Sequence, residues 1–148
     1  MNPNITLVSS LNNEQVNALV ELYSNEFWCN RRSHPDVDTM LINTDIIVGA
    51  IDEAGKLVGY ILVLTDFVYK ATTIYDLIVR PDYRNNNLGR ELMNAIIDQP
   101  ELTEVEHFDL HCLPEMIHLY EKWNFTQSLD GFCFMRRSHH NDDIKSYD

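Results

Sequence analysis

The chain has 148 residues, of which 45% are hydrophobic, and a formal net charge of −12. This length suits about one ordinary domain with a buried core. An acidic surface repels phosphate backbones and anionic lipid, so we expect no nucleic-acid partner and no membrane partner, whereas an amine-bearing substrate is compatible with it. No run approaches the ~20 apolar residues of a membrane span and the first residues lack a signal-peptide core, so we expect a cytoplasmic protein.

The N-terminal half of the sequence predicts a strand, two helices and two strands, in that order. These elements span residues 1–10, 12–27, 34–41, 44–51 and 56–66. Asn12 and Gln15 are placed as a capping box for the first helix. Pro35 lies in the first turn of the second helix, where a missing N–H is tolerated. The two strands are joined by the turn sequence DEAG.

The C-terminal half predicts a strand, a helix, a strand, a helix and a closing hairpin on an Asp-Gly turn. These elements span residues 71–79, 88–98, 105–113, 114–125 and 126–135. Because several strands follow one another, a strictly alternating doubly wound fold is excluded. We therefore expect an α/β (α+β) fold with a mixed, largely antiparallel central sheet flanked by helices. We expect one domain over residues 1–148, with its core at about 4–137 and a frayed polar tail at 138–148.

Three consecutive asparagines lie in the sequence RNNNLGR, residues 84–90, between a predicted strand and a predicted helix. Backbone N–H groups at the start of a helix lack partners within the helix and bind phosphate oxygens. Such a turn needs residues that tolerate positive φ, and asparagine is the best choice after glycine. Arg84 and Arg90 would add charged hydrogen bonds to a pyrophosphate. An ordinary surface turn remains the alternative at this point.

The segment IYDLIVRPDYRNNNLGRELM, residues 74–93, resembles the acyl-CoA-binding motif of the GNAT superfamily of acetyl-CoA-dependent N-acetyltransferases. That motif is arginine or glutamine, two residues, glycine, one residue, then glycine or alanine, after a strand that ends in Val-x-Pro. Here it runs from Arg84 to Gly89, with Val79 and Pro81 in place. HLYEKWNF, residues 118–125, resembles the superfamily's later Tyr-Glu-Lys-x-Gly-Phe segment. The resemblance covers roughly residues 4–137.

The sequence departs from this pattern at three positions. Asn87 and Asn124 replace glycines, at a helix start and just after a helix end, and both are positions where a left-handed residue is expected. Asparagine is the least costly replacement, so we expect both turns to survive. Leu113 replaces an asparagine that contacts the cofactor in many members, so the resemblance does not extend to that one contact.

The resemblance implies acetyl-CoA as co-substrate and direct attack of a primary amine on its thioester in a ternary complex. It makes Tyr120 the proton donor to the departing thiolate, with simple core packing as the alternative. The residues that it implies for cofactor binding are Leu77, Ile78, Val79, Arg84, Asn85, Asn86, Asn87, Leu88, Gly89 and Arg90.

Asp76 is the candidate general base, because it is the one carboxylate on the strand leading to the cofactor loop and burial raises the pKa of a carboxyl. A structural acceptor or a cation-holding group are the alternatives. The resemblance implies that the connection between the first two helices forms one wall of the acceptor site. The candidate acceptor residues are Trp28, Arg31, Arg32, Asp66 and Tyr75.

We expect no metal site. His107 and His111 lie four apart in a predicted strand, which places them ~13 Å apart, too far for two ligands of one zinc ion. The three cysteines have no paired spacing. The predicted function is therefore acetyl transfer to an unidentified amine acceptor. A non-catalytic acyl-CoA-binding module and a protein-modifying acetyltransferase are the alternatives, and a homodimer is left open.

Overall fold

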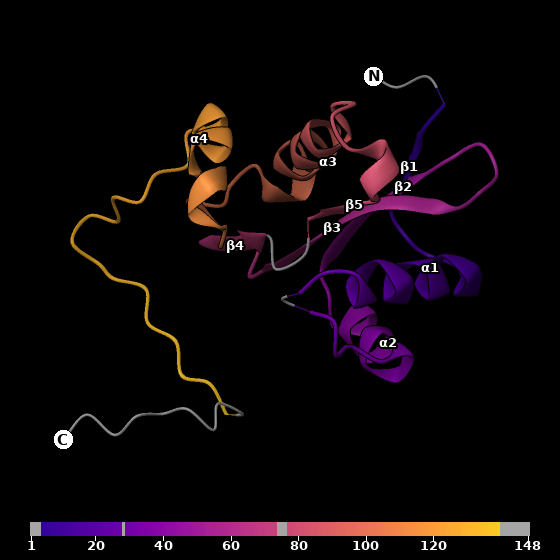
Figure 1. Cartoon of the computed structure of the whole chain (residues 1–148). Coiled ribbons are helices and arrows are strands. Elements are labelled where there is room, and N and C mark those ends of the chain that lie inside the picture. Colours follow the sequence, from indigo (N-terminus) through magenta and orange to yellow (C-terminus); the bar gives the residue numbers. More distant parts are fainter. Residues whose placement is uncertain (1–3, 28, 74–76, 140–148) are drawn as a thin grey trace. The chain divides into compact units, whose positions relative to one another are not determined.

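The computed structural model describes residues 4–27, 29–73 and 77–139. These residues fall into two units, one up to Leu113 and one from Pro114 onward. The first unit contains the sheet, three helices and the cofactor loop predicted from the sequence (Figure 1). That the whole chain is one domain stays a prediction.

Two helices near the N-terminus begin as the sequence predicts. Helix α1 spans Asn13–Ser24, and Asn12 and Gln15 form the predicted capping box: each side chain accepts from the other residue's backbone N–H. Helix α2 spans His34–Ile42 and is capped by Ser33, with Pro35 in its first turn. The predicted starts of both helices are confirmed. At each helix start, side-chain oxygens accept from backbone N–H groups that have no partner within the helix.

The sheet is mixed and mostly antiparallel, as predicted. Its strands are β1 (Thr6–Val8), β2 (Ile46–Ile51), β3 (Leu57–Thr65), β4 (Lys70–Thr73), β5 (Ile78–Val79) and β6 (His107–Asp109). Their order is β1-β2-β3-β4-β6, and β5 pairs with β3. Only the β4–β6 pair is parallel among the described strands.

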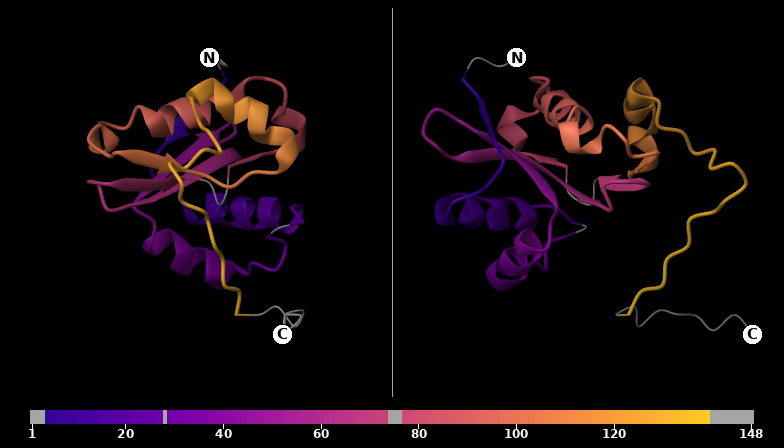
Figure 2. Two further views of the ribbon diagram at one scale, coloured as in Figure 1. Left: turned by 90° about the vertical axis from the view of Figure 1, so that its left-hand side faces the viewer. Right: turned by 180° about the vertical axis from the view of Figure 1, so that it is seen from behind.

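Helices cover both faces of this sheet (Figure 2). Helices α1 and α2 pack on one face, in a core that contains Leu19, Tyr23 and Val37 from the helices and Tyr60 and Leu62 from β3. Helix α3 (Leu88–Ile97) lies on the other face. Because side chains alternate along a strand, β3 serves both layers. The first seven residues of β3 are accordingly all buried, as expected for a strand covered on both faces.

Gly59 of β3 sets how closely α3 approaches the sheet. A Cβ at this position would lie 3.0 Å from Leu92 Cδ1 and 3.4 Å from Leu88 Cδ2. Both leucines are buried, and Leu88 is the first residue of α3. The start of the helix, where the predicted cofactor loop ends, is therefore fixed against the sheet by close packing.

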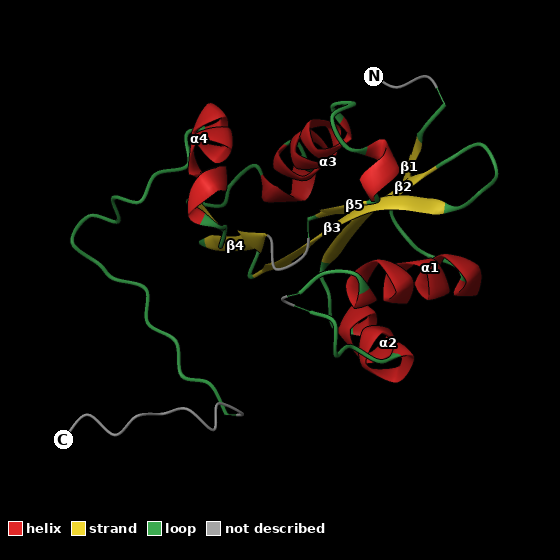
Figure 3. Ribbon diagram, viewed as in Figure 1, coloured by secondary structure: helices red, strands yellow, loops and turns green. Residues whose placement is uncertain are grey.

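The second unit differs from its prediction. In place of one helix over 114–125, three short segments follow one another: η3 (Pro114–Met116), α4 (Ile117–Tyr120) and η4 (Glu121–Trp123). Asp130 and Gly131 adopt positive φ and close a turn, with Phe132 N–H donating to the Leu129 carbonyl at 2.9 Å, but no strand forms in the described residues 124–139 (Figure 3). The predicted closing hairpin is wrong in this structure: its turn forms, but a two-stranded hairpin is only marginally stable by itself.

Candidate functional site

The loop from Arg84 to Arg90 has the backbone of an anion-binding turn. Asn85 and Asn87 have φ of 64° and 62°, in the left-handed region. Asn87 is the N-cap residue of α3. None of the backbone N–H groups of residues 85–90 donates to an acceptor in the described part of the chain, and the helical bonds begin with Glu91 N–H to the Asn87 carbonyl at 3.0 Å. The loop therefore offers a run of free donors at the positive end of a helix.

Gly89 has a conformation that any residue can adopt, and its surroundings are open. It is the second residue of α3, and a Cβ built on it would meet only Val79 Cγ2, at 4.0 Å. The fold itself therefore does not require a glycine here. A ligand that approaches the backbone closely would require one.

Leu88 and Arg90 flank this glycine with opposite roles. The Leu88 side chain is 1% exposed and packs in the core, so only its backbone N–H faces a ligand. The Arg90 side chain is exposed. Among the described residues, the predicted loop thus combines a buried anchor, backbone donors without an acceptor and an exposed arginine beside them.

Arg84 is held from two sides by the protein. Its Nε donates to the Val79 carbonyl at 2.9 Å, and its Nη2 donates to Glu26 Oε1 at 2.7 Å. A guanidinium has five N–H donors, so three remain available after these two bonds. Glu26, just beyond α1, carries no motif signature and lies 58 positions from Arg84. The sequence does not predict Glu26 as a site residue, because no local pattern indicates its contact with Arg84.

Strand β5 continues the site away from the loop. Ile78 and Val79 pair with Tyr60 and Gly59 of β3 on one side. On the other side, no described strand pairs with β5, because β6 pairs with β4 at Lys70–Thr72. The sheet therefore has an unpaired edge beside the loop. The Ile78 side chain is buried, and at the outer edge the Val79 carbonyl accepts from Arg84 Nε at 2.9 Å.

We expect Asn87→Gly to fold normally and Asn87→Val to be destabilised. A β-branched residue in the left-handed region is strained by roughly 1–2 kcal/mol, whereas glycine meets no steric penalty there. In a chain of this size, that strain lowers Tm by about 2–8 °C. Asn86→Val is the matched control, since Asn86 is also exposed and does not have positive φ. Equal melting temperatures for the two Asn87 variants would contradict the assigned turn.

Tyr120 is buried at the end of α4 in the second unit. The residue is 6% exposed, and its ring contacts the rings of Trp123 and Phe125, at centroid separations of 6.4 and 6.2 Å. Asn124 follows with φ of 63°, so the second predicted glycine substitute also adopts the left-handed conformation. The tyrosine motif thus folds as a short helix closed by a left-handed turn.

The two arginines of the α1–α2 connection have different environments. Arg32 stacks over the buried Tyr23 ring at 4.5 Å from its centroid, and its Nη1 lies 3.8 Å from Met40 Sδ. Arg31 is exposed. The stacking on Tyr23 gives Arg32 a structural contact within the connection, whereas Arg31 stays a predicted acceptor residue.

Asp66 organises the turn between β3 and β4. Its Oδ1 accepts from the backbone N–H groups of Val68, Tyr69 and Lys70 at 2.9, 2.7 and 3.0 Å. These bonds favour the ionised form and lower the pKa of the Asp66 carboxyl, the bond from Lys70 contributing most. Asp66, a predicted acceptor-site residue, therefore stabilises the turn between β3 and β4.

Three predicted site residues, Trp28, Tyr75 and Asp76, lie outside the described residues. The general base and part of the acceptor wall stay predictions.

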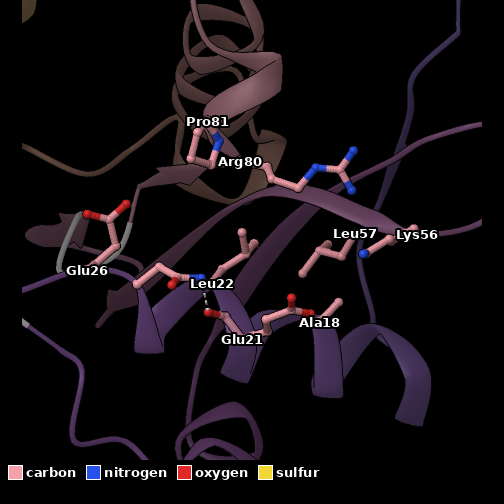
Figure 4. Close-up of a pocket in the computed structure, with 9 residues that line it drawn as sticks. Ala18, Glu21, Leu22, Glu26, Lys56, Leu57, Arg80 and Pro81 are labelled. Carbon is pink, nitrogen blue, oxygen red and sulfur yellow. Dashed lines mark hydrogen bonds between the residues drawn. The ribbon is translucent and has the colours of Figure 1, made fainter.

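A small pocket lies between α1 and the segment that leaves β5 (Figure 4). Its volume is about 60 Å³, room for about two water molecules. Glu26 lies at one end and Lys56 at the other, with Arg80 and Pro81 above α1. This volume is far below the several hundred Å³ of a typical ligand pocket, so we do not assign the acceptor to it.

Within residues 4–27, 29–73 and 77–139, no group of three or more His, Cys, Asp or Glu side chains could hold a metal ion. Over the same ranges, no helix is both long and apolar enough to cross a membrane.

Comparison with known sequences identifies relatives over most of the chain. The sequence profile of the acetyltransferase (GNAT) family matches residues 14–125. An uncharacterized N-acetyltransferase, ycf52, from Pyropia yezoensis is 29% identical over 123 residues, which cover 78% of this chain and 70% of that protein. Its counterpart in Porphyra purpurea is 29% identical over 120 residues, covering 76% and 68%.

Comparison with solved structures identifies the same fold. A GNAT-family protein from Xanthomonas campestris matches with a TM-score of 0.77 and 22% identity, over 92% of this chain and 94% of that chain. Glucosamine-6-phosphate N-acetyltransferase from Arabidopsis thaliana matches with a TM-score of 0.69 and 15% identity, over 91% and 98%. At these identities the likeness shows a shared fold.

Proposed function

Because the chain belongs to the acetyltransferase (GNAT) family, we propose that it transfers the acetyl group of acetyl-CoA to a primary amine. The observation that carries this proposal is the loop from Arg84 to Arg90. It combines two left-handed asparagines, free backbone N–H groups and a glycine whose Cβ position is open. These are the features that a pyrophosphate requires of a helix start.

In this proposal, the loop backbone binds the pyrophosphate of acetyl-CoA. The N–H groups of residues 85–90 donate to phosphate oxygens, and Arg84 and Arg90 add charge-assisted bonds. The edge of β5 that faces away from β3, with Leu77 just before it, can bond the amide groups of the pantetheine arm, except through the Val79 carbonyl, which accepts from Arg84 Nε. Leu113, where many relatives have asparagine, is exposed and contributes no side-chain hydrogen bond.

Acetyl-CoA supplies the activated thioester on which the amine acts. An ammonium group cannot attack, so the chain needs a proton acceptor, for which we propose Asp76 directly or through water. Tyr120 donates a proton to the departing thiolate. Arg31 is proposed to meet an anionic group of the acceptor, and the net charge of −12 suits an amine acceptor in general.

A panel of amines tests this function directly. Release of free CoA thiol from acetyl-CoA should rise severalfold over the acceptor-free rate with at least one class of primary amine, either small amines or lysine-containing peptides. Peptide stimulation alone would favour a protein-modifying acetyltransferase. Binding of acetyl-CoA without stimulation by any amine would favour the non-catalytic module. We further propose that the protein acts in the cytoplasm and that acetyl transfer needs no metal, which activity in the presence of a chelator would test.

A further inference from the structure

Backbone hydrogen bonds hold Glu26 in place just after α1. Its backbone N–H donates to the carbonyl of Tyr23 at 3.1 Å, and its carbonyl accepts from the N–H of Cys29 at 3.2 Å. Tyr23 and Cys29 are both buried in the core. The Glu26 side chain is 14% exposed, so its carboxylate is held in a restricted position.

The carboxylate of Glu26 fixes the orientation of Arg84. One side of the guanidinium is bound to Glu26 and another to the Val79 carbonyl at the end of β5. The Arg84 side chain is 48% exposed, and its remaining N–H donors are open to a ligand. An arginine clamped in this way loses less conformational entropy when it binds a phosphate than a freely rotating one.

We infer that Glu26 is a positioning residue for acetyl-CoA binding: through Arg84 it sets the side chain that meets the pyrophosphate. This inference rests on the proposed function of the loop. It also joins the cofactor loop to the α1–α2 connection, the segment predicted to form one wall of the acceptor site. In this inference Glu26 acts through its bond to Arg84 and not by contact with the cofactor.

The test is a double-mutant cycle on acetyl-CoA affinity, with calorimetric titration of wild type, Glu26→Gln, Arg84→Ala and the double variant. Arg84→Ala should weaken binding roughly ten- to hundredfold, the range for a hydrogen bond to a charged group. Glu26→Gln should weaken it roughly three- to thirtyfold, as expected for coupled neighbours. In the Arg84→Ala background, Glu26→Gln should not change the acetyl-CoA affinity further, because the guanidinium that Glu26 orients is absent.

Glu21→Gln is the matched control for charge. Glu21 lies on α1 in the same pocket lining, and its removal lowers the negative charge by the same amount without contacting Arg84. Its affinity for acetyl-CoA should equal that of wild type or exceed it slightly. Melting temperatures of all variants separate positioning from loss of fold. The Arg84 Nε–H signal in an NMR spectrum, assigned by its absence in Arg84→Ala, should shift and exchange faster in Glu26→Gln.

The outcomes separate the two proposals. If wild type shows no saturable acetyl-CoA binding, the proposed function fails. If wild type binds but Glu26→Gln binds equally well or more tightly, Glu26 does not position Arg84 and the function stands. Additive effects in the cycle would likewise overturn the inference, and so would an unchanged Arg84 Nε–H signal in Glu26→Gln.

Discussion

Gly89→Val should abolish measurable acetyl-CoA binding while the protein stays folded. A β-branched side chain at this point covers the backbone donors that a pyrophosphate must reach. Losing two hydrogen bonds to charged oxygens, at about 1.5–3 kcal/mol each, weakens binding by about 3–6 kcal/mol, a factor of roughly 10²–10⁴. The fold should tolerate the change because the added Cβ meets only Val79 Cγ2 at 4.0 Å, and valine suits a helix better than glycine does.

Gly59→Ala is the matched control for this experiment. Its added Cβ would lie 3.0 Å from Leu92 Cδ1, so this substitution should lower Tm. Gly59→Ala should therefore lose stability and keep acetyl-CoA binding. Gly89→Val should do the opposite, with a Tm close to that of wild type and no calorimetric signal for acetyl-CoA. Wild-type affinity in Gly89→Val would mean that the pyrophosphate does not approach the loop backbone.

Tyr120→Phe should lower kcat and leave the dissociation constant of acetyl-CoA nearly unchanged. The substitution keeps the ring, and with it the packing against Trp123 and Phe125, and removes only the hydroxyl. General acid catalysis contributes ~10²–10⁴-fold, and the loss should fall at the low end because a CoA thiolate is a fair leaving group. Steady-state rates with a stimulating amine, measured beside the binding constant, separate proton donation from scaffolding.

Thermal melting must accompany that measurement, because loss of a buried hydroxyl can also destabilise the fold. A Tyr120→Phe variant with wild-type kcat would make Tyr120 a packing residue that happens to occupy the motif. A variant with a normal Tm and a reduced kcat would support its role as donor.

Backbone conformation at the asparagines could be predicted from the sequence because it depends on local chemistry. Asn87 and Asn124 replace glycines at helix ends, and both adopt φ close to 60°. The capping box of Asn12 and Gln15 is predictable for the same reason, since its partners are three residues apart. The sheet follows from the order of apolar segments, and its mixed, largely antiparallel pairing is confirmed.

Contacts between distant segments could not be predicted in this way. The Glu26–Arg84 pair joins positions 58 apart, and no local pattern marks Glu26. The sequence predicts Arg32 as a substrate-binding residue, but in the fold its guanidinium lies over the Tyr23 ring. The hairpin predicted at 126–135 depends on a neighbouring strand as well as on its turn, and only the turn forms.

The measurement that tests the central claim most directly is an amide NMR titration of the wild-type protein with acetyl-CoA. The backbone N–H signals of residues 85–90 should shift together and saturate, because these donors gain phosphate acceptors. Signals of β1, which β2 and β3 separate from β5 in the sheet, should stay in place. Saturable binding that leaves residues 85–90 unchanged would contradict the assigned cofactor site, and no saturable change anywhere would contradict acetyl-CoA binding itself.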